Sequence, residues 1–122
     1  MRVNAIASLA AIAALAACTA DQGPPLPAAP ADLQNAVNAR GANECNRAVA
    51  SVLAERGVTG AQLTGLRYTD SVAMRGGRGD SFINGQTAWV YLQGQQGVGI
   101  VHLGNQCEVH GVSTDGSFRY PR

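Results

Sequence analysis

The sequence predicts an α+β domain in which an N-terminal helix packs on an antiparallel sheet of about four strands. Apolar residues recur at helical spacing between Asp32 and Arg56, and apolar and polar residues alternate in several segments after Thr64. The 122 residues are 46% hydrophobic and 14% charged, a balance typical of a folded chain rather than a disordered one. The net charge of +1 lacks the basic excess of a nucleic-acid-binding protein.

The predicted helix has recognisable signals at both ends. Asp32 can cap its start, and Gly57 is a suitable residue to end it. Gly41 interrupts the apolar pattern and Asn43 could cap a second helix, so the segment is either one helix with a weak point or two short helices. The residues that share one helical face are Cys45, Val49, Val52, Leu53 and Arg56.

The remainder of the chain is predicted to form strands. Alternation from Thr64 to Arg75 indicates one half-buried strand or a bent pair, followed by a glycine-rich loop. Three further strands are expected at Thr87–Leu92, Val98–Leu103 and Gln106–Val112. Short connections between them favour an antiparallel meander.

Loop lengths suggest a register for these three strands. A five-residue loop would pair Leu92 with Val98, and a three-residue loop at 104–106 would pair Leu103 with Cys107. The face toward the helix would then carry Trp89, Tyr91, Val101, Leu103, Cys107 and Val109. The opposite face would carry Ala88, Val90, Leu92, Val98, Ile100, His102, Glu108 and His110.

That opposite face contains the candidate partner surface. A single helix covers only one side of a sheet, and an exposed apolar patch usually marks an interaction site. A C-terminal segment, Phe118 to Tyr120, could instead fold back over the patch. The candidate partner residues are Val90, Leu92, Val98 and Ile100.

The first 17 residues have the layout of a secretory signal peptide. Arg2 supplies the positive charge, and about 13 mostly apolar residues follow, too few to span a bilayer, which needs roughly 20. The segment ends in Leu15-Ala16-Ala17-Cys18, which resembles the lipobox of bacterial lipoproteins. The resemblance implies cleavage after Ala17 and fatty acylation of Cys18.

The same resemblance implies a location. Thr19, rather than Asp, follows the cysteine, which in lipoproteins favours delivery to the outer membrane, facing the periplasm. Alternatively, an ordinary signal peptidase could cut after Ala20 and release a soluble secreted or periplasmic protein. Residues 18–31 are proline-rich and are expected to form an extended tether before a single domain at 32–122.

Cys45 and Cys107 are the two cysteines that remain in the domain. In an oxidising cell envelope they are expected to form a disulfide. No C-x-x-C motif is present, and neither cysteine has a neighbouring His or Lys in sequence that would activate its thiol.

Two groups of residues could carry chemistry. His102, Glu108 and His110 would share a face and resemble a zinc ligand set that lacks a fourth member. The loop at 76–81 combines glycines with Arg78, Asp80 and Ser81. Both are expected to be ordinary polar segments, so we expect no bound metal and no cofactor.

The sequence therefore predicts a lipid-anchored cell-envelope lipoprotein with a non-enzymatic binding or structural role. Its expected partners are the membrane, through Cys18, and an envelope protein, the cell wall or a second copy. The alternative is a small periplasmic enzyme or enzyme inhibitor that uses the 76–81 loop or the face carrying His102, Glu108 and His110.

Overall fold

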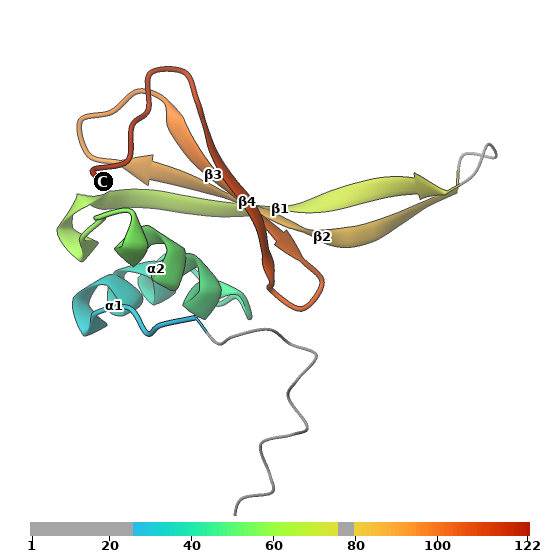
Figure 1. The fold of residues 1–122 in the computed structure, drawn as a ribbon, viewed down its shortest axis with the longest axis horizontal. Coiled ribbons are helices and arrows are strands. Elements are labelled where there is room, and N and C mark those ends of the chain that lie inside the picture. The colour runs from blue at the N-terminus through green and yellow to red at the C-terminus, as the bar shows by residue number, and fades with distance from the viewer. Residues whose placement is uncertain (1–25, 76–79) are drawn as a thin grey trace, which may run out of the picture.

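The computed structural model describes residues 26–75 and 80–122. The described part has an α+β fold, as predicted, with two helices on one side of a four-stranded antiparallel sheet of order β1-β2-β3-β4 (Figure 1). The elements are α1 (Ala31–Ala39), α2 (Asn46–Glu55), a short 3-10 helix, η2 (Gly60–Gln62), and the strands β1 (Leu63–Arg75), β2 (Asp80–Leu92), β3 (Val98–Gly104) and β4 (Val109–Asp115). The signal peptide, Cys18 and the first part of the tether lie outside the described residues. Within residues 26–75 and 80–122, no helix has the length and apolar character needed to cross a membrane.

The two helices are separated at Gly41, where φ is +144°. Asn46, at the start of α2, is buried and holds this break together. Its Nδ2 donates to the Gly41 carbonyl at 2.9 Å, and its Oδ1 accepts a hydrogen bond from the Tyr68 hydroxyl of β1 at 2.7 Å. A buried amide must be hydrogen-bonded to be tolerated, so this network fixes the helix break to the sheet.

The expected caps differ in detail. Pro30 occupies the N-cap of α1, and Asp32 lies in the first turn, where its charge still favours the helix dipole. Asn43 does not cap α2 directly. Its side-chain oxygen accepts from the Cys45 N–H at 2.7 Å, which forms a turn immediately before the helix.

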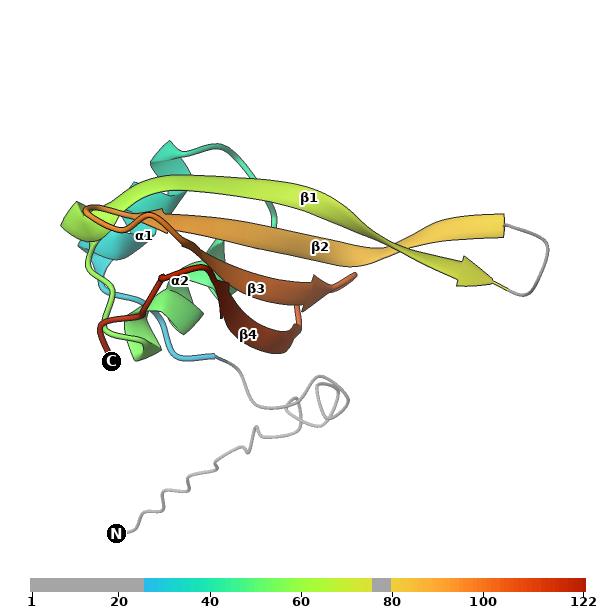
Figure 2. The same cartoon turned by 90° about the horizontal axis from the view of Figure 1, so that it is seen from above.

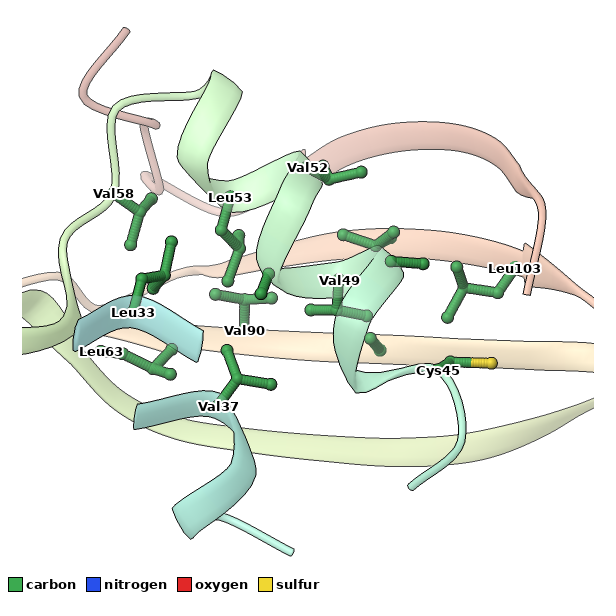
Figure 3. Packing of buried hydrophobic residues seen from close by; sticks show 14 of the residues in the cluster. Leu33, Val37, Cys45, Val49, Val52, Leu53, Val58, Leu63, Val90 and Leu103 are labelled. Carbon is green, nitrogen blue, oxygen red and sulfur yellow. The ribbon is translucent and has the colours of Figure 1, made fainter. Parts of the chain in front are cut away.

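The core lies between the helices and one face of the sheet (Figure 3). Leu33 and Val37 of α1 and Val49 and Leu53 of α2 are fully buried there. They pack in one cluster with buried residues of β1, β2 and β3: Leu63, Ala88, Val90, Leu92, Val101 and Leu103.

The predicted register between β2 and β3 is wrong by one residue. The structure pairs Trp89 with Ile100 and Ala88 with Val101, rather than Leu92 with Val98. Because side chains alternate across a strand, a shift of one residue places each predicted set of β2 residues on the other face. Ala88, Val90 and Leu92 therefore face the helices, and Trp89 and Tyr91 face away.

Two glycines and an aromatic side chain account for this register. A Cβ at Gly99 would lie 2.9 Å from the ring of Phe118, and one at Gly97 would lie 2.9 Å from the Phe118 Cβ. Phe118 thus occupies the space that side chains at positions 97 and 99 would need. It is almost fully buried and belongs to the core.

The last connection is also longer than predicted. Leu103 pairs with Val109 rather than Cys107, and β4 begins at Val109 instead of Gln106. The Gly104 N–H donates to the Glu108 carbonyl at 2.8 Å, which closes the turn. Cys107 lies within this connection in the left-handed region, with φ +64°.

β1 and β2 extend beyond the remainder of the sheet as a two-stranded ribbon (Figure 2). β2 begins seven residues before the predicted Thr87, and its pairing with β3 stops at Gly85. We call residues 71–75 and 80–84 the arm. A register irregularity between Ser71 and Val72 marks its base. Val72, an apolar residue of the alternating segment 64–75, is 60% exposed.

Candidate interaction surface

The predicted disulfide between Cys45 and Cys107 is confirmed. The two Cα atoms are 5.2 Å apart, and the bond joins the start of α2 to the connection between β3 and β4. Gln86 Nε2 of β2 donates a hydrogen bond to the Cys45 sulfur at 3.8 Å. The bond therefore has a structural role, because it links the helical layer to the β3–β4 connection of the sheet.

The candidate partner surface requires correction. Val90 and Leu92 are 0% and 4% exposed and belong to the core. Val98 and Ile100 are half-buried and lie on the opposite face, because Ile100 pairs with Trp89 and Val98 is two residues away on the same strand. The four residues therefore do not form one surface.

The C-terminal segment covers the helix side of the sheet, not the other side. The Tyr120 ring lies 5.5 Å from the Arg56 guanidinium at the end of α2, and the Arg122 N–H donates to the Arg56 carbonyl at 2.8 Å. Phe118 and Tyr120 contact edge to face, with ring centroids 4.8 Å apart. Burial raises the pKa of Tyr120 above its ordinary value, and Arg56 opposes part of this effect.

The sheet face that points away from the helices is here called the open face. The helices and the C-terminal segment both lie on the other side, so no element among the described residues covers it (Figure 2). Its residues are Arg67, Thr69, Trp89, Tyr91, Val98, Ile100 and His102.

Trp89 is the centre of the open face, and its ring is held in place. Its Nε1–H donates to the Thr69 hydroxyl at 2.8 Å, and the Arg67 guanidinium lies 5.7 Å from the ring centroid. Ile100 pairs with Trp89 from the neighbouring strand. A fixed aromatic side chain loses little conformational entropy on binding, which is typical of residues that anchor interfaces.

Tyr91 extends this aromatic region. It is 37% exposed and pairs with Gly65 on β1. A Cβ at position 65 would lie 3.2 Å from the Tyr91 ring, so the glycine leaves room for the ring to lie over β1. Tyrosine is favoured at interfaces because it combines apolar area with a polar hydroxyl.

The predicted histidine and glutamate group is not assembled as expected. His102 lies on the open face and pairs with Gly111, whereas Glu108 lies in the connection before β4. His110 Nε2 is 3.8 Å from Glu108 Oε2, and both side chains are more than half exposed. No three His, Cys, Asp or Glu side chains of the described ranges are arranged to hold a metal ion.

Glu108 has a local structural role. Its Oε1 accepts from the Gln106 N–H at 2.8 Å. Hydrogen bonds from its own N–H and from that of Gln106 hold the pKa of the Glu108 carboxyl below its ordinary value, with a smaller contribution from His110. The carboxylate thus stabilises the turn that contains Cys107.

Residues 76–79 of the predicted chemical loop, including Arg78, lie outside the described residues. Ser81 lies at the start of β2 and is exposed. Comparisons with protein-family models, with curated proteins and with solved structures find no match to this chain.

Proposed function

We propose that this chain is a lipid-anchored lipoprotein of the cell envelope whose domain is a non-enzymatic binding module. Acylation of Cys18 would anchor it in the outer membrane, with the domain in the periplasm. The proposal for the anchor rests on the lipobox-like segment Leu15-Ala16-Ala17-Cys18 that follows an apolar stretch of suitable length.

One observation supports the binding role above the others. The helices and the C-terminal segment cover the same side of the sheet, which leaves a fixed Trp89 and an exposed Tyr91 on the open face. Aromatic residues and Arg are enriched in interface centres, and Arg67 lies beside them. The partner we propose is an envelope protein or the cell wall.

An enzyme or enzyme inhibitor remains the second hypothesis. His110 lies beside Glu108, but the described residues contain no group of three His, Cys, Asp or Glu side chains that includes His102. The binding role needs no such group, and we therefore prefer it.

The anchor is tested by metabolic labelling with a fatty-acid probe. The native chain should incorporate the probe and fractionate with membranes, and the Cys18→Ala variant should do neither. Label retained by Cys18→Ala would overturn the lipid attachment.

The binding surface is tested by photo-crosslinking in intact envelopes. A benzophenone side chain at position 91 should give a discrete adduct, whereas the same group at exposed Glu55 of α2 serves as the matched control. An adduct that is lost in an Arg67→Ala background would assign it to the open face. Equal labelling patterns at 91 and 55 would argue against a specific partner there.

A further inference from the structure

We propose that the Cys45–Cys107 bond is a thiol–disulfide exchange site, at which a dithiol attacks the Cys107 sulfur and Cys45 leaves as the thiolate. This inference goes beyond the proposed function, because it concerns neither the open face nor the lipid anchor. It rests on the unequal exposure of the two cysteines, on the position of Cys45 at the start of α2 and on a side-chain amide that donates to the Cys45 sulfur.

The two cysteines differ in how a reductant can reach them. Cys45 is 1% exposed and belongs to the core, whereas Cys107 is half-buried. Cys107 lies in the connection between β3 and β4, and its neighbours Gln106 and Glu108 are exposed. The rate of exchange depends on which sulfur the attacking thiolate can approach. The accessible side of the bond is therefore Cys107, and attack there leaves the electron pair of the broken bond on Cys45.

The position of Cys45 stabilises that electron pair. Cys45 is the N-cap residue of α2, a helix of ten residues, and its side chain makes no cap hydrogen bond while it is bonded to Cys107. The N–H groups in the first turn of a helix lack helical partners, and the partial positive charge there favours an anion. A sulfur released from Cys107 can accept from these groups, so Cys45 is the better placed of the two cysteines to leave as a thiolate.

Gln86 of β2 supplies a further donor for the leaving sulfur. Its Nε2 donates to the Cys45 sulfur at 3.8 Å, and its Oε1 accepts from Asn43 Nδ2 at 2.9 Å. Asn43 is held in turn by the Cys45 N–H, which donates to its Oδ1 at 2.7 Å. Burial alone disfavours a charged sulfur, so a donor fixed in advance is needed to offset it. Hydrogen bonds to ionised acceptors are stronger than those to neutral ones, so Gln86 stabilises the thiolate more than the disulfide.

The backbone at Cys107 favours the same reaction. Its φ of +64° lies in the left-handed region, which is unfavourable for a residue with a Cβ. Cys107 is half-buried within a connection rather than inside a strand, so its main chain can relax when the sulfur is released from Cys45. Cleavage therefore removes backbone strain on the attacked side of the bond while the other side gains a stabilised thiolate.

The exchange balances as a two-electron reaction. One thiolate of the dithiol bonds to the Cys107 sulfur, the bond to Cys45 breaks, and its electron pair leaves on Cys45. The second thiol of the reductant loses its proton, attacks the reductant's own sulfur in the mixed disulfide and releases Cys107 as a thiolate. The reductant becomes a disulfide, and its two protons pass through solvent to the two cysteines. The β3–β4 connection is then no longer bonded to α2, so the stability of the domain follows the redox state of its surroundings.

The site of attack is tested on the folded, oxidised mature chain, residues 18–122 with Cys18→Ser. Excess 2-mercaptoethanol is added without denaturant, free thiols are trapped at early times by alkylation, and the peptides are mapped by mass spectrometry. We expect the mixed disulfide on Cys107 and the alkyl group on Cys45. A mixed disulfide on Cys45, equal adducts on both cysteines, or no reaction until urea is added would overturn the proposal.

The role of the amide donor is tested by Gln86→Leu. This variant should slow reduction of the bond by dithiothreitol at neutral pH by about threefold, because the leaving thiolate loses a hydrogen bond. The matched control, Gln93→Leu, changes an exposed glutamine just after β2 and should leave the rate unchanged. A Gln86→Leu rate equal to or above that of the unsubstituted chain would overturn the assignment of Cys45 as the stabilised leaving group.

Discussion

Replacing both Cys45 and Cys107 by Ala should cost the domain about 4 kcal/mol of unfolding free energy. The disulfide closes a loop with a sequence separation of 62, and the chain-entropy relation assigns about 4 kcal/mol to a loop of that length at 25 °C. Removing the buried Cys45 sulfur adds about 1 kcal/mol. The left-handed backbone at Cys107 can relax once the bond is gone, which returns about 1 kcal/mol. Small domains are stable by only about 5–15 kcal/mol, so the change is large.

Urea unfolding followed by Trp89 fluorescence measures this difference. The denaturant dependence should also steepen, because the unfolded chain without the crosslink exposes more surface. Wild-type protein unfolded in the presence of a reductant is the matched control and should show a similar loss. A loss below about 1 kcal/mol in both samples would refute the reasoning from loop entropy.

Three further perturbations test the interior. Tyr68→Phe leaves the Asn46 Oδ1 without its hydroxyl donor and should cost about 1–3 kcal/mol in urea unfolding. Because burial raises the Tyr68 pKa above its ordinary 10.0, wild-type stability should fall as pH rises above that value, and Tyr68→Phe should remove this part of the pH dependence. The Ser51 hydroxyl is buried without a hydrogen-bond partner among the described residues, so Ser51→Ala should raise the free energy of unfolding by about 1 kcal/mol and raise the melting temperature. A lower melting temperature would contradict the inference that this hydroxyl is unsatisfied. Gly85→Ala would drive a Cβ into the main chain of β3 and should lower the melting temperature more than Gly94→Ala. Gly94 also has a positive φ, but a Cβ there would meet no atom within 4 Å. Equal melting temperatures for the two variants would contradict the close approach of β3 to Gly85.

The features that could be predicted from sequence depend on short-range patterns. Helical spacing and strand alternation indicate the α+β class, and an even number of cysteines in the domain indicates the Cys45–Cys107 bond. The strand register depends on a long-range contact instead. Gly97 and Gly99 accommodate Phe118, which lies about twenty residues later and has no local signal that places it there.

The β2 half of the arm, residues 80–84, was missed for a related reason, whereas residues 71–75 lie within the predicted strand that begins at Thr64. Asn84-Gly85 is a common turn sequence, and it interrupts the apolar alternation of β2. In the structure, Gly85 instead lies inside the continuous strand β2 and has a φ of +155°. It pairs with Ser71 at the register irregularity where the arm begins. A glycine in a strand can mark either a turn or a bulge, and only the neighbouring strands decide which.

The positions of Phe118 and Cys107 in the sequence have a consequence for the order of events in folding. The core cannot close until Phe118 reaches the space beside Gly99, and the disulfide cannot form until Cys107 is accessible to Cys45. Arg122 also contacts the end of α2, because its N–H donates to the Arg56 carbonyl. A chain that has been synthesised only as far as β3 therefore lacks both the ring that fills the core beside Gly99 and the cysteine that bonds to Cys45. These contacts join segments far apart in the sequence, so they form after the local structure of the helices and hairpins.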